Sequence, residues 1–528
     1  MEPFLRPRLP MHLLPFCLAA ASLVSAAACG DNQAAQADAA PGDDATPGED
    51  GTEQADADRY AALEQQVWLE ASSLGASGAA AAVIEGGELK WAKGFGFTWW
   101  SKDAAAKPTT LFRIASVTKQ MTAAAVLRLV DDGLVDLDAP VTQYVPDFHL
   151  SDDPVAAASI TVRDLLTHAS GMPDVLRTDW PDSTDAALSG YLTSDTFRGE
   201  VNLIAPPGKL FNYSNPGYML AGLLVERASG QYYRDYLTQH LFTPLGMSRT
   251  FMASSDVVAD GDYAAGTQGE QVDIPWLAPC AGVWTSVLDL AKWVVFLLAG
   301  NAEVLSDASR AELMAAQVGV HKDWAPIDHD YSPIDIVSYG YGFFVQDAVI
   351  LDDGYYELPL VAHSGSFGAY RADIVLVPSQ RFAFISLANA PSGHLSESIR
   401  VALRALVTLP AKQAVPQDPM TTARFPDYVG TWYDPHLLGW FAIRAGASTL
   451  ELDIPGMAVG TYSSDLACPA RDVCKITLPG TGTYPATFTR DGTGNVEYLV
   501  TPSYVGKRIN ADPSLTDGGV PPDSGLHP

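Results

Sequence analysis

The sequence predicts an α+β domain followed by a small β-rich domain, and two observations carry this prediction. First, residues 79–84 and 89–92 are apolar runs on either side of a segment with Gly86 and Gly87, which is typical of a β-hairpin. Second, short apolar runs return only after a long, mainly helical region, at 358–363, 372–377 and 382–388. We therefore expect an antiparallel sheet built from both ends of this region, flanked by helices and interrupted by an all-helical insert.

Acidic residues outnumber basic ones. The 528 residues include 62 Asp and Glu against 32 Lys and Arg, which gives a formal net charge of −30. Such a charge argues against nucleic acid and anionic membrane surfaces as electrostatic partners. The histidines and cysteines lack the spacing of zinc ligands, so we expect no metal and no cofactor. The expected partner is a small-molecule or peptide substrate, and the sequence leaves the oligomeric state open.

Residues 1–28 are typical of an export signal peptide. Arg6 and Arg8 precede an apolar run over 13–24 that is short for a transmembrane helix. Residues 26–28 fit ordinary signal peptidase, whereas the following residue, Cys29, completes a pattern that resembles a bacterial lipobox. We favour a lipoprotein, attached to the membrane only through Cys29, in the periplasm or on the cell surface. Ordinary cleavage would leave a secreted or periplasmic protein.

The rest of the chain divides by composition. Residues 29–58 contain no Lys, Arg or aromatic side chain, which predicts a disordered acidic linker. The main domain is expected over 59–409, beginning with a helix at Tyr60. A Pro- and Gln-containing stretch at 410–424 is typical of a second linker. Short strands with frequent Gly and Pro then predict a small β-rich domain over 425–510, followed by a disordered tail over 511–528.

Three cysteines lie within the predicted domains. In an exported protein, Cys468 and Cys474 are candidates for a disulfide, because they flank a predicted turn or bulge. Cys280 has no evident partner, and we interpret it as a buried structural thiol.

Ser116 and Lys119 form the first of three candidate catalytic motifs. The Ala-, Leu- and Met-rich stretch after Ser116 favours a helix, so Ser116 is expected at or near its first turn. Residues three apart on a helix share a face, which places the Lys119 amine beside the Ser116 hydroxyl. A serine nucleophile needs such a neighbour to take its proton. Alone, Ser-x-x-Lys also fits an incidental lysine on a buried Ala-rich helix.

Tyr213 and Asn215 form the second motif, in a stretch bounded by turn residues. In a loop or short strand, side chains two apart point the same way, so a phenol and an amide can enter one cleft. A phenolate beside a lysine ammonium can act as a general base, and the amide can hold both the lysine and a substrate carbonyl. Alone, Tyr-x-Asn is a common pattern and fits a turn held by Asn215 better than a catalytic motif.

His363, Gly365 and Ser366 form the third motif, where a predicted strand enters a Gly-rich turn. Gly365 would let a substrate approach the strand closely, and the Ser366 N–H could complete an oxyanion hole with the Ser116 N–H. His363 would supply a hydrogen-bond donor or, at lower pH, a positive charge. His168 lies in a turn with no catalytic partner beside it, and we interpret it as a structural histidine.

In this order, the motifs resemble those of the serine β-lactamase and penicillin-binding-protein family, whose signature is Ser-x-x-Lys, Ser/Tyr-x-Asn and Lys-Thr-Gly. Tyr213 in the second motif is similar to class C β-lactamases and D,D-peptidases. His363 departs from the family's Lys, as in D-aminopeptidase-like and esterase-like members. The segment after residue 419 resembles the β-barrel appendages of some members. The similarity covers about 59–409 and includes 165–171, 207–208, 244–247 and 339–342.

The resemblance implies a β-lactamase/transpeptidase-like fold and an exported serine hydrolase. Ser116 would form an acyl-enzyme while Lys119, coupled to Tyr213, accepts its proton. The remaining motif residues would bind the substrate: Asn215, His363, Gly365 and Ser366.

A neutral imidazole at position 363 would hold a substrate carboxylate less tightly than a lysine. We therefore expect an ester, amide or D-amino-acid peptide substrate, of the carboxypeptidase, aminopeptidase or esterase type, rather than a β-lactam. The alternative is a slow, acylated binder or sensor of cell-wall peptides or β-lactams. An α/β-hydrolase is not supported, because the sequence has no Gly-x-Ser-x-Gly elbow.

Overall fold

The computed structural model describes residues 52–150, 154–175, 177–266, 273–320, 337–351, 354–414, 418–434, 438–457, 460–478, 482–501 and 505–510. The predicted signal peptide, Cys29 and the predicted tail lie outside these ranges. By its contacts the chain divides into Met1–Ala62 and Leu63–Pro528, and the second unit holds both the main domain and the C-terminal β-domain.

The first helix begins earlier than predicted. Helix α1 covers Thr52–Ser73, so the last seven residues of the expected acidic linker, from Thr52 to Asp58, are helical. Acidic residues favour a helix N-terminus, and Ala, Glu and Gln have high helix propensity. The absence of basic and aromatic residues was therefore a poor guide to where the helix starts.

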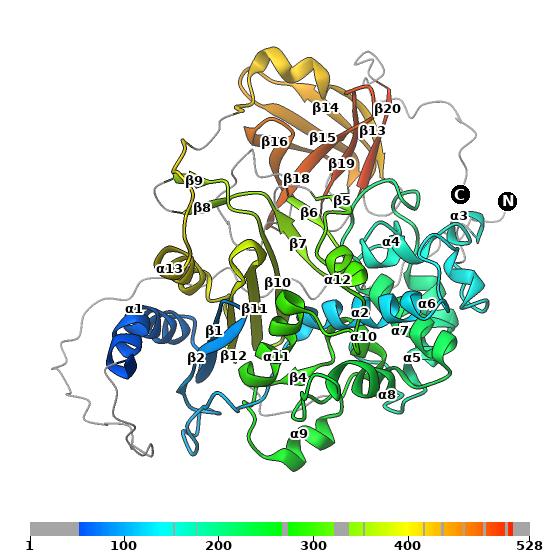
Figure 1. Ribbon diagram of the computed structural model, residues 1–528. Coiled ribbons are helices and arrows are strands. Elements are labelled where there is room, and N and C mark those ends of the chain that lie inside the picture. Colours follow the sequence, from blue (N-terminus) through cyan, green and yellow to red (C-terminus); the bar gives the residue numbers. More distant parts are fainter. Residues whose placement is uncertain are drawn as a thin grey trace. The chain divides into compact units, whose positions relative to one another are not determined.

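The centre of the main domain is an antiparallel sheet of eight strands within the described residues (Figure 1). In spatial order these are β2 (Glu88–Gly96), β1 (Gly78–Glu85), β12 (Phe382–Ala388), β11 (Tyr370–Val377), β10 (Leu360–Phe367), β7 (Phe344–Gln346), β6 (Val337–Tyr339) and β5 (Val318–Gly319).

The predicted hairpin and the predicted closure of the sheet are both confirmed. Strands β1 and β2 are joined through Gly86 and Gly87, whose φ angles of +63° and +83° are costly for residues with a side chain. Strand β1 then pairs with β12, with Ala79 opposite Ala388, so the two ends of the domain meet in one sheet.

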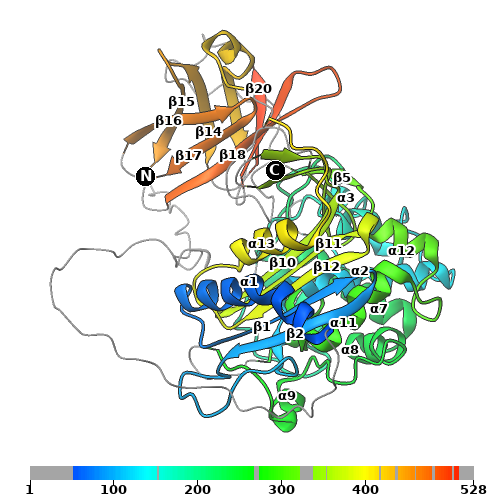
Figure 2. The ribbon, with the colours of Figure 1, turned by 60° about the vertical axis from the view of Figure 1, so that its left-hand side comes forward.

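Helices cover both faces of the sheet. Figure 2 shows α1 and α13 (Ser396–Leu406) on one face, and α2 (Thr118–Asp131), α7 (Asn215–Ser229) and α11 (Val287–Ala299) on the other. Helix α2 is buried almost all round, as expected of a helix at the centre of a core. None of the described helices is long and apolar enough to cross a membrane. The remaining helices are α3 (Pro154–Ala157), α4 (Val162–Leu166), α5 (Ala187–Leu192), α6 (Asp195–Glu200), α8 (Tyr233–Leu237), α9 (Ser254–Asp260), α10 (Ala278–Ala281) and α12 (Asp307–Leu313).

The C-terminal β-domain is a closed antiparallel barrel. Its core packs around Trp432, and a disulfide joins Cys468 to Cys474. Tyr498 of the barrel lies in one apolar cluster with Leu210 of the main domain, just before the Tyr213 motif. The barrel strands are β13 (Gly430–Asp434), β14 (Gly439–Ala445), β15 (Leu450–Met457), β16 (Gly460–Ala470), β17 (Val473–Leu478), β18 (Gly482–Arg490), β19 (Val496–Val500) and β20 (Val505–Asn510).

Glu70 of α1 caps the N-terminus of α13. Its carboxylate accepts the N–H groups of Glu397 at 2.9 Å and Ser398 at 2.8 Å, and the Ser398 hydroxyl at 2.7 Å. The first N–H groups of a helix have no partner within the helix, and a negative charge there is favourable. Glu70 therefore connects the two helices on this face of the sheet.

We expect Glu70→Ala to lower the free energy of unfolding by about 1–2 kcal/mol, because helix-cap losses have this size. Urea unfolding checks this. Glu303→Ala, at an exposed glutamate, is the matched control and should be close to neutral. Equal stability of the two variants would show that the cap contributes nothing.

Candidate active site

Ser116 lies in a single 3₁₀ turn, Ala115–Val117, that leads into α2. The sequence analysis expected Ser116 at or near the first turn of the helix, and this is confirmed, because α2 begins directly after the 3₁₀ turn, at Thr118. Ala115 has a φ of +46°, a left-handed conformation that a residue with a side chain adopts at a cost. The strained backbone keeps Ser116 half-buried at the start of α2, with Lys119 one turn further along.

Lys119 is fully buried and connects three segments of the chain. Its Nζ donates to Ser116 Oγ at 3.1 Å, to Asn215 Oδ1 at 2.7 Å and to the carbonyl oxygen of Cys280 at 3.1 Å. An ammonium has three N–H groups, so these acceptors satisfy it fully. The contact predicted by the Ser-x-x-Lys spacing is therefore present in the structure.

Cys280 contributes its main chain rather than its thiol. Sequence reasoning interpreted this residue as a structural thiol, and the thiol does donate to the Leu277 carbonyl at 3.2 Å. Burial raises the pKa of the thiol to about 11, so it stays protonated at neutral pH. The carbonyl bound to Lys119 was missed, because a backbone acceptor leaves no signal in residue type.

Tyr213 lies directly beside the lysine. The Lys119 Nζ is 4.8 Å from the centre of the Tyr213 ring. Burial raises the pKa of the Tyr213 phenol, while Lys119 and hydrogen bonding to Lys119 and Ser116 lower it in part. The resting side chain is therefore the phenol, rather than the phenolate expected from its place beside a lysine.

Asn215 is the first residue of α7, not a loop residue. Ser214 before it is extended and caps the helix through its hydroxyl, which accepts the Gly217 N–H at 3.2 Å. An extended residue between them places the Tyr213 and Asn215 side chains on one side, as predicted. The side-chain carbonyl of Asn215 accepts a hydrogen bond from Lys119. Contact of its amide with a substrate carbonyl stays a prediction.

Asp174 was not identified from the sequence, and it completes this network. Its Oδ1 accepts the side-chain Nδ2–H of Asn215 at 2.8 Å and the main-chain N–H of Asn215 at 3.1 Å. Burial of the carboxyl raises its pKa, and the hydrogen bonds from Asn215 and the charge of Lys119 lower it in part. Asp174 is nevertheless exposed to solvent.

His363 is enclosed by protein and is neutral. Its Nδ1 lies 2.7 Å from the Ser364 carbonyl, which can only accept, so Nδ1 carries the proton and Nε2 accepts from the Tyr339 hydroxyl at 3.1 Å. Burial lowers the pKa of His363 to about 3, assisted by the charge of Lys119. With both ring nitrogens occupied, the structure places no donor of His363 toward a substrate. A substrate contact by this residue stays a prediction.

Gly365 allows a close approach, but within the chain itself. A Cβ at this position would lie 2.1 Å from the Ile114 carbonyl oxygen and 3.1 Å from the Ser116 nitrogen. Strand β10 pairs with β7 only as far as Ala362, so its later part runs past the nucleophile turn. The predicted oxyanion donors, the N–H groups of Ser116 and Ser366, therefore lie on adjoining segments. Ser366 itself is exposed.

His168 has the structural role that the sequence analysis gave it. Its Nδ1 accepts the Ser214 N–H at 2.9 Å, and its ring centre lies 4.2 Å from that of Tyr213. Burial, with the charge of Lys119, lowers the pKa of His168 well below its ordinary value. This neutral ring fixes the segment that carries Tyr213 and Asn215.

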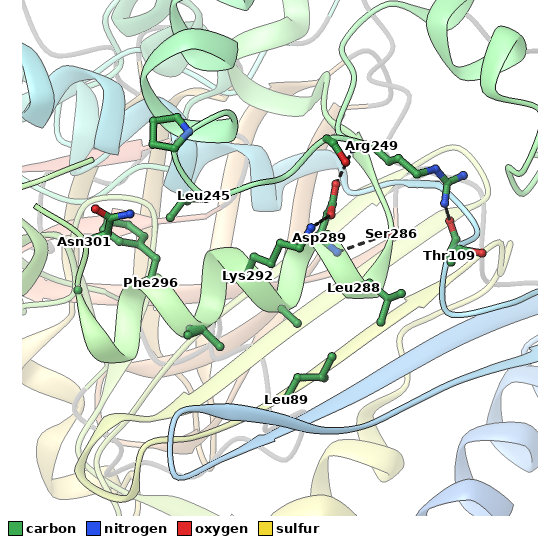
Figure 3. A pocket seen from close by; sticks show the side chains of 15 residues that line it. Leu89, Thr109, Leu245, Arg249, Ser286, Leu288, Asp289, Lys292, Phe296 and Asn301 are labelled. Carbon is green, nitrogen blue, oxygen red and sulfur yellow. Dashed lines mark hydrogen bonds and ion pairs between the residues drawn. The ribbon is translucent and has the colours of Figure 1, made fainter. Parts of the chain in front are cut away.

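A separate groove of about 690 Å³ lies along α11 (Figure 3). Lys292 and Asp289 form an ion pair of 2.7 Å on one wall, and Leu89 lies on another. None of the residues around Ser116 lines it. The candidate catalytic centre is therefore identified by the hydrogen bonds around Lys119 rather than by this groove.

Comparison with known proteins agrees with the geometry. Residues 54–409 match the family model described as Beta-lactamase. Protein flp of Staphylococcus aureus (strain MW2) is 27% identical over 330 residues, which cover 61% of each chain. Unguisins hydrolase ungD' of Aspergillus campestris is 28% identical over 330 residues, 59% of this chain and 58% of that protein. The chain thus spans about three fifths of the length of these relatives.

A solved structure supports the fold. D-amino acid amidase from Ochrobactrum anthropi SV3, complexed with L-phenylalanine, superposes with a TM-score of 0.51 at 22% identity, covering 65% of this chain and 98% of that one. At this identity the similarity concerns the fold alone.

Gly365→Ala should slow acylation of Ser116 about tenfold or more, because small displacements of reacting groups can cost up to about a hundredfold. The added Cβ meets backbone that cannot rotate away. The rate of reaction with a fluorophosphonate measures the effect. Gly319→Ala in β5, where a Cβ meets nothing within 4 Å, is the control. A wild-type rate for Gly365→Ala would contradict the described approach of β10 to the nucleophile.

The lowered pKa of His363 predicts a pH dependence of stability. The folded protein keeps this ring neutral down to about pH 3, whereas the unfolded chain binds a proton below about 6.5. This contribution to stability is present above pH 6.5 and is lost as the pH falls toward 3. Wild-type stability should therefore fall more steeply between pH 6.5 and 4 than that of His363→Asn, measured by urea unfolding. Parallel slopes would mean that His363 titrates normally.

Proposed function

The chain belongs to the beta-lactamase family, and from this premise we propose that it is a serine hydrolase that forms an acyl-enzyme on Ser116. The observation that carries the proposal is the 3.1 Å contact between Ser116 Oγ and Lys119 Nζ at the start of a buried helix. A hydroxyl beside a lysine that is held on its other sides is the arrangement of an activated nucleophile.

The contacts of Lys119 suit both its neutral form, before a proton transfer, and its protonated form, after it. As a neutral amine, Nζ would donate its two N–H groups to Asn215 and Cys280 and turn its lone pair to the Ser116 hydroxyl. When Oγ attacks the substrate carbonyl, its proton passes to Nζ, which then has three N–H groups. The Tyr213 phenol lies within hydrogen-bonding reach of both groups and can relay the proton to the leaving group.

The remaining steps follow from ordinary acyl transfer. The carbonyl π electrons move to oxygen, and the N–H groups of Ser116 and Ser366 would stabilise the resulting oxyanion. Collapse expels the protonated leaving group and leaves the acyl-Ser116 ester. Water then attacks this ester and gives its proton to Nζ. The intermediate collapses, the acid product leaves, and the proton on Nζ returns to Ser116 Oγ.

For the substrate we propose an ester or amide, including amides and peptides of D-amino acids. The neutrality of His363 supports this, because a β-lactam or a carboxypeptidase substrate presents a carboxylate that gains nothing from an uncharged, enclosed imidazole. The similarity to a D-amino acid amidase is consistent with the amide class, and the similarity to unguisins hydrolase is consistent with a hydrolase.

We also propose that the protein is exported and lipidated at Cys29. The support is in the sequence, where the charged residues, the apolar run and the small residues before Cys29 follow one another in the order of a lipoprotein signal. A change in the electrophoretic mobility or mass of the mature protein in Cys29→Ala would test it.

Intact mass after incubation with a fluorophosphonate tests the nucleophile. We expect one adduct on the wild type and none on Ser116→Ala, because the reagent reports activated serines. Ser159→Ala, at an exposed serine, should be labelled like the wild type. No adduct on the wild type would contradict the proposal. A single acyl burst without turnover of any ester or amide would favour the acylated binder.

A further inference from the structure

Only one oxygen of the Asp174 carboxylate has a hydrogen-bond partner among the described residues. Oδ1 is occupied by the two N–H groups of Asn215. Within the described parts of the chain, Oδ2 has no hydrogen-bond or ion-pair partner, and the residue is exposed. A carboxylate has acceptor sites on both oxygens, so this one can accept a further donor from a ligand.

Within the described residues, no cation forms an ion pair with Asp174, although the charge of Lys119 acts on it through Asn215. Lys119 is the nearest cation of the centre, but it is fully buried and all its N–H groups are used. His363 is neutral at any working pH. Arg177, three residues along, pairs with Glu200 and, at 2.7 Å, with Asp179. The charge that a substrate meets beside Asn215 is therefore negative.

We propose that Asp174 binds a protonated amine of the substrate and so selects amine-bearing esters and amides. The inference rests on the proposed hydrolase function and names its substrate class. One side chain, Asn215, links the carboxylate to Lys119, and Lys119 contacts the nucleophile. In the proposed complex, the amine lies at the Asp174 end of this hydrogen-bonded network and the scissile carbonyl lies at the Ser116 end.

A second role for Asp174 must be separated from this one. By accepting both Asn215 N–H groups, the carboxylate also orients the amide so that its oxygen faces Lys119. Loss of that role would slow every substrate equally. Loss of an ammonium site would affect only substrates that carry the charge.

The test compares alanine benzyl ester, in both enantiomers, with benzyl propionate, which has the same skeleton without the amine. Asp174→Asn keeps a carbonyl oxygen for Asn215 and removes only the charge. For the preferred enantiomer we expect kcat/KM to fall about tenfold to a hundredfold, mainly through KM, as for hydrogen bonds to charged groups. Benzyl propionate reports only the loss that arises through the orientation of Asn215, so its kcat/KM should fall clearly less than that of alanine benzyl ester. Asp179→Asn removes a charge from the same segment and should leave both substrates unchanged.

Binding gives a readout that needs no turnover. In a Ser116→Ala background, alaninamide should raise the melting temperature more than propionamide does, and Asp174→Asn should abolish the difference. Equal losses for both esters in Asp174→Asn would contradict the amine site, and so would a wild-type preference for benzyl propionate. Neither result would contradict the hydrolase function. Absence of a fluorophosphonate adduct on the wild type would instead overturn the hydrolase itself.

Discussion

The buried amine of Lys119 is the constraint on which the rest of the site depends. A charge removed from water is tolerated only where acceptors surround it. Its acceptors come from three places far apart in the sequence: Ser116 beside α2, Asn215 at the start of α7, and the Cys280 carbonyl in α10. Folding that satisfies this one amine therefore brings the nucleophile, the amide and the supporting helices together.

The packing around the lysine keeps these groups in place. Gly365 lets β10 lie against the turn of Ser116, where any side chain would collide with the Ile114 carbonyl. On the other side, the His168 ring packs on Tyr213 and binds the Ser214 N–H. Both histidines near the amine are held neutral by burial, because a second positive charge beside Lys119 would be unfavourable. The packing of the sheet and the helices and the neutrality of the two histidines thus favour the same arrangement of the catalytic groups.

Sequence patterns were informative where local geometry decides the outcome. Gly86 and Gly87 specified the first hairpin, and the three-residue spacing from Ser116 to Lys119 was enough to predict their contact. The contacts of Asp174 and of the Cys280 carbonyl could not be predicted in this way, since they exist only between elements brought together by folding. Gly365 was recognised as a site of close approach, yet its neighbour is the chain's own backbone rather than a ligand.

The electrostatic balance of the site follows from which of its charged groups are buried and which are exposed. The positive charge of Lys119 is buried and bound by Ser116, Asn215 and the Cys280 carbonyl. It therefore acts on proton transfer rather than on substrate recognition. With His363 neutral, the motif that holds a lysine in relatives with the full signature contributes no second cation. Among the described residues, the carboxylate of Asp174 is then the charged group that binds this amide and is exposed to solvent. A site whose cation takes part in proton transfer and whose anion faces the substrate should favour positively charged substrates. A site built to bind carboxylates should favour negatively charged ones.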